Sequence, residues 1–517
     1  MNRVYRLEVV AGLCCLCIGC GAPTITLPNT LIATTQNPLV AQYWMVSACS
    51  GQVMVEFGPD TSYGRSTSWS SIQSRYPTRL LVAGMRAATT YHMRSHLTCG
   101  GSPWTSRDQT FTTGPLPSTS FPTLTITRPN PSLSSTESPG IELLNLLDIT
   151  GTSKMIQSLV TDRDGNPIWY YDTGVKQGYF PSTFKVLPNS HMIFSISKGN
   201  LFGTILRDID LAGNTIREMD IAALEQKMQA HGGFDFVPMG YHHDVLPLPN
   251  GHLIVLVNFY QDFTNLPGYP GTTSVLGDGL VDLDQDWNPV WAWSAFDHLD
   301  VNRHLNGLPD WTHGNAVVYS PNDGNLLLSM RHQSWIIKID YNNGTGTGNV
   351  LWKLGYGGDF TLASTDPSLW FSFQHFPSLI DQNGSQDTLA VWDNGNNRPI
   401  DSFGNVCNPS RSPQCYSRGV ILQIDESTKA ASIAWEDLPG FFSVWGGSIG
   451  QLANNNVEFD INAMAFPSNP SLAGQVQEVT QTPNPQIVWQ MDINTAPAYA
   501  YRAYRIPSLY AGVSWNY

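Results

Sequence analysis

The chain has 517 residues and a formal charge of −14, with 27 Lys and Arg against 41 Asp and Glu. A chain this acidic is a poor nucleic-acid binder, because neutralising phosphates requires clustered Lys and Arg. Hydrophobic residues make up 41%, which is enough for a sizeable core and excludes wholesale disorder. Charged residues make up only 13%, and Gly, Pro and Trp are plentiful. This composition favours short strands joined by turns over coiled coils or long solvated helices.

The first twenty residues have the organisation of an export signal. Two arginines precede an apolar run over residues 9–18, as in a secretory signal peptide. The end of the run resembles a bacterial lipoprotein signal, in which small residues precede a Cys that becomes lipidated, although Cys17 replaces the usual Leu. We therefore expect residues 1–20 to be a lipoprotein-type signal peptide, with a lipid anchor at Cys20 and export to the periplasm or cell envelope. Ordinary secretion with complete removal of the segment is the alternative.

Four cysteines remain in the body of the chain, at Cys49, Cys99, Cys407 and Cys415. In an oxidising compartment an even number indicates disulfides. Three pairings are possible, and Cys49–Cys99 with Cys407–Cys415 is favoured because each pair lies within one expected structural unit. None of these four cysteines forms a Cys-x-x-Cys motif, which argues against a zinc knuckle or a thioredoxin-like site.

Residues 24–116 predict a small β-sandwich. Residues 53–58 and 90–94 alternate at the period of a strand. The stretch over residues 88–91 resembles the fibronectin type III turn that leads into a Tyr-bearing strand, and we expect this domain to carry no chemistry. Residues 117–139 are rich in Pro, Ser and Thr, which is typical of a linker or an edge element.

From about residue 140 two motifs alternate along the chain. One is a turn followed by a strand that ends in Trp, and the other is a Pro-Asn turn followed by a strand. The first motif ends at Trp169, Trp291, Trp352, Trp435 and Trp489, with a degenerate sixth copy at residues 213–217. The second occurs at residues 187–190, 248–251 and 320–324, with weaker copies at 381–384 and 452–455.

Six copies over residues 140–517 give roughly 63 residues per repeat, somewhat more than the about 40–50 of a four-stranded propeller blade. The chain is therefore predicted to be all-β, a six-bladed β-propeller preceded by the small sandwich. A jelly roll or a parallel β-helix would not explain two alternating motifs per unit. Residues 222–230 are the main helical candidate.

Four motifs in this second part combine His with unusual neighbours, and each is expected to precede or open a strand in a different repeat. They are residues 241–244 (Tyr-His-His-Asp), 310–315 (Asp-Trp-Thr-His-Gly-Asn), 329–333 (Ser-Met-Arg-His-Gln) and 373–376 (Phe-Gln-His-Phe). The inner strands of a propeller line one channel, so equivalent residues of successive blades converge. His243, His313 and His375 are spaced by 70 and 62 residues, about one blade each, and are therefore expected to meet.

Together these motifs resemble the bacterial arylsulfate sulfotransferase family. The likeness is strongest from residue 241 to residue 397, and the Asp-Trp-x-His-x-Asn element with an Arg 18 residues beyond its His is its most specific part. The resemblance implies a fibronectin-like domain followed by a six-bladed propeller. It also implies transfer of a sulfuryl group from a phenolic sulfate ester to a phenol, by a ping-pong mechanism through a sulfurylated histidine, with no nucleotide sulfate donor and no metal.

By this resemblance His375 is the nucleophile, His313 and Arg331 hold the sulfuryl oxygens, and Asn315 assists. The chemistry is sound in itself, since sulfuryl transfer, like phosphoryl transfer, spreads negative charge over non-bridging oxygens. Fixed cationic donors stabilise that charge. A neutral imidazole is a competent nucleophile that also departs again. A phenol, with a pKa near about 10, leaves readily as phenolate.

Either His243 or its neighbour His242 completes the site. Because adjacent side chains on a strand face opposite sides, only one of the two is expected to point into the channel, and His243 is favoured because the Asp follows it in the family's pattern. Cys407–Cys415 departs from the family, whose best-known disulfide precedes its nucleophilic His, whereas this pair follows His375.

Two other classes of function remain open from the residues alone. One is a non-catalytic envelope-binding lipoprotein, and the other is a metal- or quinone-dependent propeller enzyme. The His-His-Asp sequence at 242–244 could be a metal ligand pair, but no Glu or Asp cluster at ligand spacing accompanies it, so neither a metal nor a cofactor is expected. The expected partners are phenolic sulfate donors and phenol acceptors. A homodimer stays open, because fibronectin-like domains can mediate dimers.

Overall fold

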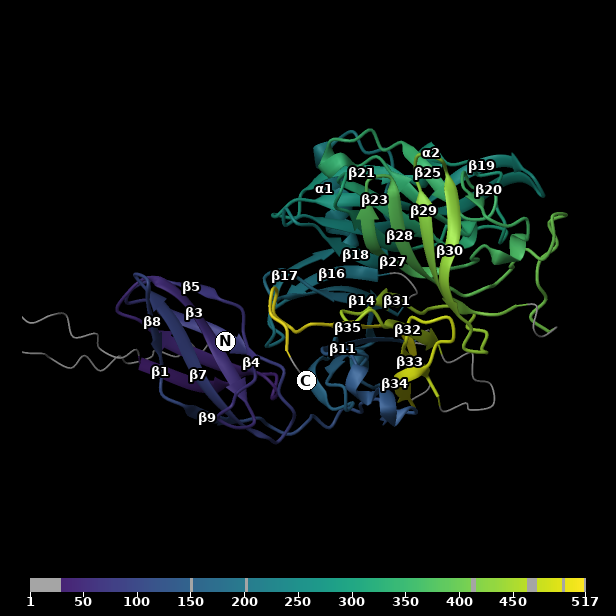
Figure 1. Ribbon diagram of the computed structural model, residues 1–517. Coiled ribbons are helices and arrows are strands. Elements are labelled where there is room, and N and C mark those ends of the chain that lie inside the picture. Colours follow the sequence, from purple (N-terminus) through teal and green to yellow (C-terminus); the bar gives the residue numbers. More distant parts are fainter. Residues whose placement is uncertain are drawn as a thin grey trace, which may run out of the picture.

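The computed structural model describes residues 29–148, 152–199, 203–410, 415–462, 472–494 and 498–515. The predicted signal peptide and the lipid anchor at Cys20 lie outside these residues. The prediction of an all-β chain is confirmed, since almost every regular element is a strand in an antiparallel sheet. Figure 1 shows a small lobe, strands β1–β9, beside a large lobe, strands β10–β35. Across the described residues, no helix combines the length and apolarity needed to cross a membrane.

The small lobe is built from two antiparallel sheets (Figure 1). One contains β1 (Asn29–Thr34), β2 (Ala41–Val46) and β6 (Pro77–Val82). The other contains β3 (Gly51–Gly58), β4 (Arg65–Ser66), β5 (Ser70–Ile72), β7 (Thr90–Cys99), β8 (Ser102–Thr105) and β9 (Gln109–Thr112). Val53, Val55 and Phe57 alternate inward along β3 and are fully buried, as the period of two predicts.

In the large lobe most strands fall into groups of four, of which the second and third are joined into one eight-stranded sheet by the pairing of Gly203 with Tyr241. The groups are β35 (Tyr499–Ile506), β11 (Ile141–Leu147), β12 (Ser158–Thr161) and β13 (Pro167–Tyr171); β14 (Tyr179–Val186), β15 (Met192–Lys198), β16 (Gly203–Ile209) and β17 (Thr215–Asp220); β18 (Gly240–Pro247), β19 (Leu253–Leu266), β20 (Tyr269–Leu283) and β21 (Pro289–Ser294); β22 (Gly314–Ser320), β23 (Asn325–Met330), β24 (Trp335–Ile339) and β25 (Val350–Leu354); β27 (His375–Asn383), β28 (Gln386–Asp393), β29 (Arg418–Asp425) and β30 (Ala430–Asp437); and β31 (Ile449–Gln451), β32 (Val457–Asn462), β33 (Gly474–Val479) and β34 (Ile487–Ile493).

Shorter elements decorate these groups. The segment predicted to be a linker or edge element contains β10 (Leu124–Thr127), which pairs with β34 at the edge of its sheet. β26 (Thr361–Leu362) pairs with β30. The helix expected near residues 222–230 is α1 (Ile221–His231), and a second, short helix is α2 (Ala295–His298). One-turn 3-10 helices are η1 (Pro131–Thr136), η2 (Val175–Gln177), η3 (Arg331–Gln333), η4 (Asn342–Gly344) and η5 (Pro367–Leu369).

Tryptophans of four outermost strands tie their group to the next, and three of them, Trp169, Trp435 and Trp489, belong to the repeated motif. In the third group the bond comes from Trp293 rather than Trp291, and Nε1 of Trp352 in the fourth is buried without a partner among the described residues. In each of the four bonds the indole N–H donates to a backbone carbonyl in the outer turn of the following group. The pairs are Trp169 to Leu211 at 2.8 Å, Trp293 to Gly348 at 2.9 Å, Trp435 to Thr482 at 3.1 Å and Trp489 to Arg163 at 2.9 Å. The last of these joins the final group back to the first.

Both favoured disulfides are present and confirm the predicted pairing. Cys49 and Cys99 lie 5.8 Å apart between their Cα atoms, and Cys407 and Cys415 lie 5.3 Å apart. The first joins the start of β3 to the end of β7 in the small lobe, and the second closes a short loop between β28 and β29.

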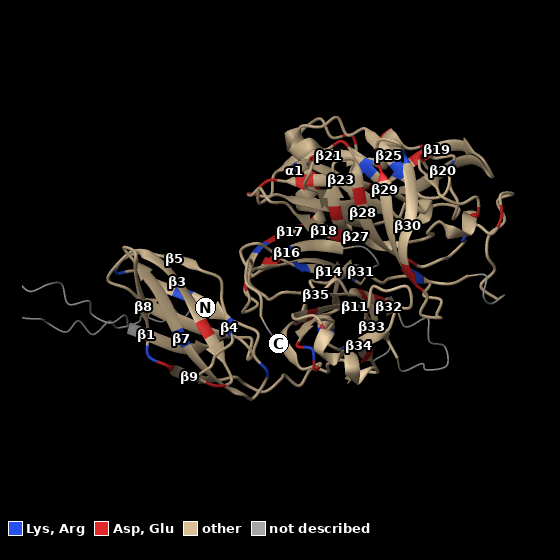
Figure 2. Cartoon of the chain, in the orientation of Figure 1, with Lys and Arg blue, Asp and Glu red and all other residues tan. Residues whose placement is uncertain are grey.

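The two lobes contact one another through the C-terminal tail and through ion pairs of Arg79 and Arg86. The ring of Trp515 packs edge-on against Phe57 with centroids 5.7 Å apart, and its indole N–H donates to the carbonyl of Ser66 at 2.9 Å. Arg79 of the small lobe pairs with Asp210 of the large lobe at 3.1 Å. Figure 2 shows Lys and Arg interspersed with Asp and Glu over both lobes.

The C-terminal strand β35 is anchored by a buried cation among carboxylates. Arg505 contacts Glu142 of β11, Glu458 of β32 and Glu478 of β33. All three carboxylates are buried, and burial together with the nearby Glu142 raises the pKa of Glu458 well above its usual range. One guanidinium therefore compensates charges from three strands that meet only in the folded chain.

Arg505→Met is expected to lower the free energy of unfolding by about 3–5 kcal/mol, because it leaves buried carboxylates without their cation. The midpoint of urea unfolding, followed by Trp fluorescence, measures this loss. The matched control is Lys353→Met, which removes the partly exposed pair with Asp359 and is expected to cost less than about 1 kcal/mol. Equal losses in the two variants would contradict this account of Arg505.

Candidate active site

Several strands from neighbouring groups of the large lobe contact one another, and their register with the partner strand shifts near their N-terminal ends. β14, β18, β22 and β27 contact one another in succession, and β35 lies beside β32 and β11. The register shifts at Ser182 in β14, between residues 241 and 245 in β18, at Asn315 in β22, between residues 375 and 378 in β27, and at Tyr501 in β35. Bulges re-aim side chains that regular alternation would separate. Most of the predicted site residues lie at or beside these shifts.

Four histidine rings form a continuous cluster at this end of the strands. The ring of His243 lies 4.2 Å from that of His242 and 5.1 Å from that of His313, measured between centroids. His242 lies 5.2 Å from His313, and His332 lies 4.5 Å from His313 on its other side. The expected meeting of the motifs around His243 and His313 is therefore a feature of the structure.

The expectation that only one of His242 and His243 faces this space is wrong, because both rings contact His313. The alternation rule fails here since β18 is irregular between Tyr241 and Val245, and His243 has a positive φ of 36°. At a bulge two residues of one strand face one residue of its partner, so the strict alternation of side chains is lost there.

Two carboxylates fix the tautomers of this cluster. Nδ1 of His242 lies 2.6 Å from Oδ1 of Asp278, and Nδ1 of His313 lies 2.6 Å from Oδ2 of Asp310. A carboxylate accepts, so each Nδ1 carries the proton and the lone pair of each neutral ring is on Nε2. Asp278 also accepts from the backbone N–H of Gly314, which ties β20 to the start of β22.

His375 is held in the tautomer that a nucleophile needs. The amide of Asn394 donates from Nδ2 to the carbonyls of Ser443 at 2.8 Å and Gly446 at 3.0 Å, so its Oδ1 faces the imidazole. Nδ1 of His375 lies 2.7 Å from that oxygen and therefore carries the proton. The lone pair is on Nε2, where the long 3.3 Å contact from the backbone N–H of Gly446 is the hydrogen bond that this nitrogen accepts.

Arg331 and Asn315 lie beside these rings. Nη1 of Arg331 contacts Nε2 of His332 at 2.6 Å, and Nη2 donates to the carbonyl of Val444 at 3.0 Å. Asn315 donates to the carbonyl of Gln374 at 2.7 Å, which links the start of β22 to the start of β27. Within the described part of the chain, Nε of Arg331 and Oδ1 of Asn315 are buried without a hydrogen-bond partner.

The expectation that the four His motifs lie in different repeats is wrong for two of them. Residues 310–315 lead into β22 and residues 329–333 end β23, and these are adjacent strands of one sheet. The spacing of 18 residues between His313 and Arg331 is the length of a hairpin rather than of a repeat. The hairpin pairing brings the two motifs together directly, and the backbone N–H of Arg331 donates to the carbonyl of His313 at 3.1 Å.

Sequence reasoning missed two residues of β35 that lie against this cluster. Tyr501 stacks on His243 with centroids 5.2 Å apart and meets His375 edge-on at 6.2 Å. Arg502 pairs with Asp244 at 3.0 Å and donates to the backbone carbonyl of Asn315 at 2.8 Å. A signal was present, because Tyr501 lies 126 residues after His375, two repeats of about 63.

Burial sets the electrostatics of the site. Desolvation first, and then the nearby positive groups, lower the pKa of His243, His313 and His375 well below the usual 6.5, so these rings are neutral at neutral pH. Desolvation also lowers the pKa of Arg331 to about 10, so its guanidinium stays cationic. Burial raises the pKa of the Tyr501 hydroxyl to about 12.

The cluster also has the composition of a metal site. One ligand nitrogen from each of His242, His243 and His313 lies within 4.8 Å of the others, and a second such set joins Asp310, His313 and His332. The expectation of no metal depended on the absence of a Glu or Asp cluster at ligand spacing in the sequence. In the folded chain Asp310 lies close enough to His313 and His332 to be an acidic ligand.

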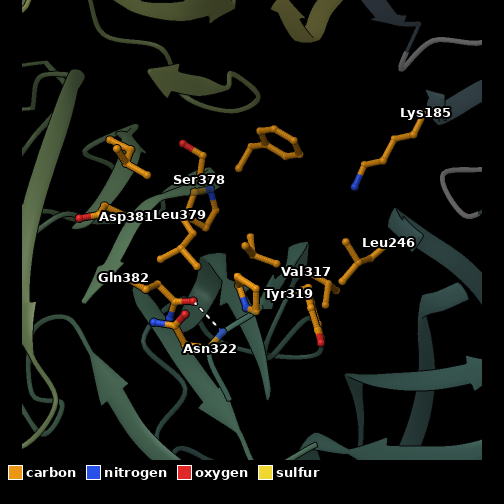
Figure 3. A pocket seen from close by; sticks show the side chains of 14 residues that line it. Lys185, Leu246, Val317, Tyr319, Asn322, Ser378, Leu379, Asp381 and Gln382 are labelled. Carbon is orange, nitrogen blue, oxygen red and sulfur yellow. Dashed lines mark hydrogen bonds between the residues drawn. The ribbon is translucent and has the colours of Figure 1, made fainter. Parts of the chain in front are cut away.

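A separate cavity of about 630 Å³ lies at the other end of β22 and β27 (Figure 3). Val317, Tyr319, Leu379 and Gln382 line it, and Lys185 points its amine toward it (Figure 3). None of the six predicted site residues lines this cavity. The histidine cluster and the cavity therefore occupy different ends of the same strands.

Comparison with known proteins gives the family. The model of the arylsulfotransferase (ASST) family matches residues 134–505, most of the chain. The chain belongs to the arylsulfotransferase family. This confirms the resemblance read from the His motifs, all of which lie within the matched residues.

A curated relative is the arylsulfate sulfotransferase AssT of Escherichia coli O6:H1 (strain CFT073), which is 23% identical over a match that covers 38% of this chain and 40% of the relative. Solved structures with some similarity are dihydro-heme d1 dehydrogenase NirN (TM-score 0.32, 14% identity, 74% of this chain and 79% of that one) and cobalt-substituted Synechocystis ACO (TM-score 0.33, 11% identity, 90% and 96%).

The buried neutral histidines predict a loss of stability in acid. The unfolded chain protonates His375 near pH 6.5, whereas the folded chain does not until a lower pH. The free energy of unfolding therefore falls as the pH drops through 6.5, by about 1.4 kcal/mol per pH unit for each such histidine. Urea unfolding of the wild type and His375→Gln between pH 7.5 and pH 5 (about 2.5 units) measures the slope. His375→Gln should show the shallower slope, and identical slopes would contradict a neutral His375.

Proposed function

We propose that this protein transfers a sulfuryl group from a phenolic sulfate ester to a phenolic acceptor, in two steps through His375 and without a nucleotide sulfate donor. The single observation that carries the proposal is the orientation of His375. Its Nδ1 donates to an amide oxygen that two backbone carbonyls fix in place. The lone pair is therefore on Nε2, in a neutral ring beside a cationic Arg331, and attack on sulfur requires only that the long 3.3 Å contact from the N–H of Gly446 be given up. Membership of the arylsulfotransferase family supports the reaction class.

In the first step Nε2 of His375 attacks the sulfur of the donor. The N–S bond forms as the bond from sulfur to the aryl oxygen breaks, and the phenolate leaves with the electron pair. In the second step the oxygen of the acceptor phenol attacks the same sulfur, the N–S bond breaks, and its electron pair returns to Nε2. The proton of the acceptor passes to a neutral histidine of the cluster or to water.

The neighbouring residues stabilise the sulfuryl oxygens. Arg331 supplies the fixed positive charge, and its Nε is a buried donor that has no partner within the described residues. The rings of His313 and His243 border the space for the remaining oxygens, and His313 becomes a donor there when its Nε2 takes up a proton. Asn315 orients the segment before His375 through its bond to Gln374. The carboxylate of Asp278 orients His242, whose ring packs against that of His243. Fixed donors of this kind need no reorganisation as charge develops.

We further propose that the groups of four strands in the large lobe are the six blades of a propeller over residues 140–517. Successive contacts between β14, β18, β22, β27 and β31 support this arrangement. So do the four Trp-to-carbonyl bonds, the last of which returns to the first group. Residues 24–116 form the fibronectin-like sandwich and 117–139 the connection between the two.

Export is part of the same proposal. Two disulfides in the structure fit an oxidising compartment, which supports a periplasmic or envelope location after a lipoprotein-type signal over residues 1–20. Lipidation of Cys20 and pairing of two copies through the small lobe are the proposed modes of anchoring and assembly.

Purified protein is expected to release nitrophenolate from nitrophenyl sulfate when phenol and a chelator are present, with sulfated phenol as the second product. His375→Ala should lower this rate by at least about a thousandfold, because no other group replaces the nucleophile. His252→Ala is the matched control, since His252 also pairs with a carboxylate, at 3.0 Å from Asp282, but outside the cluster. Release that needs no phenol would indicate a hydrolase, and no release would overturn the proposed function.

Arg331→Met is expected to lower kcat/KM for nitrophenyl sulfate by about 100- to 1000-fold, as removal of a fixed donor to a developing anion does. Arg331→Lys should recover part of this loss, because it restores the charge without the planar donor set. Initial rates over a range of donor concentrations measure both. A change of less than about tenfold in Arg331→Met would show that the guanidinium does not contact the sulfuryl group.

A further inference from the structure

Three histidines of the candidate site, which we call the histidine triad, present their nitrogens to a common point. One ligand nitrogen from each of His242, His243 and His313 lies within 4.8 Å of the other two. Tetrahedral zinc binds imidazole nitrogens at about 2.0–2.1 Å, which sets them about 3.4 Å apart. A movement of at most about 1.4 Å by the side chains would close the difference.

The surroundings of the triad are those of metal-binding histidines. Such residues almost always donate the second ring N–H to a carboxylate, which fixes the tautomer and orients the ring. The carboxylate of Asp278 accepts a hydrogen bond from Nδ1 of His242, and that of Asp310 accepts one from Nδ1 of His313, both at 2.6 Å. These bonds place the lone pair on Nε2 of each ring. Nδ1 of His243 is buried and lacks a hydrogen-bond partner among the residues that the structure describes.

The ligand type selects the ion. Three neutral imidazoles with no coordinating carboxylate suit zinc and its neighbours in the first transition row, rather than Mg²⁺ or Ca²⁺, which prefer oxygen. His243 and His313 are only partly buried, so an ion can reach them from solution. A site with three His ligands leaves a fourth position for water or an anion.

We propose that the histidine triad binds one zinc ion and that this ion inhibits sulfuryl transfer by competing with the aryl sulfate. The inhibitory half of this inference rests on the proposed function, and the binding half does not. A zinc ion held by these nitrogens occupies the space between the rings in which the proposed function places the sulfuryl oxygens. The ion and the donor substrate therefore exclude one another at His243 and His313.

Calorimetric titration of metal-stripped protein with zinc chloride tests the binding. One equivalent should bind to the wild type, and cobalt(II) chloride should give the visible absorption of a tetrahedral site. His313→Ala should abolish this binding, and Asp310→Asn should weaken it by about 10- to 100-fold, because Asp310 orients a ligand without contacting the ion. Circular dichroism of each variant in chelator establishes that it is folded.

Two controls separate the triad from other histidines. His375→Ala removes a histidine outside the triad that is joined to His243 through the ring of Tyr501, and His252→Ala removes a carboxylate-paired histidine elsewhere. Both are expected to keep the wild-type affinity for zinc. Undiminished binding by His313→Ala, or no binding by the wild type, would overturn the proposal.

Initial rates with nitrophenyl sulfate and phenol test the inhibition. Added zinc should raise the apparent KM for nitrophenyl sulfate without lowering kcat, and excess chelator should restore the original KM. Activation by zinc, or inhibition that more donor does not relieve, would overturn the competitive role. If the wild type transfers no sulfuryl group even with chelator, the proposed function fails, and the calorimetric titration still decides the zinc site.

Discussion

The guanidinium of Arg502 connects the parts of the chain on which the candidate site depends. It lies on β35, the last strand, which pairs with β11 from the beginning of the large lobe. From there it pairs with Asp244 of β18 and donates to the backbone carbonyl of Asn315 in β22. Asp244 is fully buried and is further paired with Lys185. A charge pair this deep is costly to leave incomplete, so the site forms only when strands from both ends of the chain are assembled.

Irregular backbone is the second constraint. In a regular strand the side chains alternate, and consecutive residues cannot share one space. At His242 and His243 a bulge and a left-handed residue bring adjacent rings to the same side. At β35 the extra residue is Tyr501, whose ring covers His243. The repetition of such shifts at the same end of several strands explains why histidines, an amide and a tyrosine gather there.

The electrostatics of the cluster are local rather than global. The chain is strongly acidic, which does not favour an anionic substrate at long range. Within the cluster, burial keeps the imidazoles neutral, and Arg331 retains its charge. Asp278 and Asp310 accept hydrogen bonds from histidine N–H groups and thereby order the rings. An anion at the cluster meets the N–H donors and the positive charge of Arg331. A transition-metal ion meets the lone pairs of the neutral imidazoles.

The amino-acid sequence by itself determined the all-β class, the strands that end in Trp, the two disulfides, the helix near residue 225 and the family, because these depend on local periodicity and on short motifs. It also indicated that His243 and His313 meet, whereas His375 is joined to His243 through the ring of Tyr501. It could not show that His242 faces the same space, because a bulge is set by the partner strand. Only the tertiary structure supplied Tyr501, Arg502 and the amide of Asn394 that fixes His375. These contacts join residues far apart in the chain, and apart from the two-repeat spacing between His375 and Tyr501 no local pattern marks them.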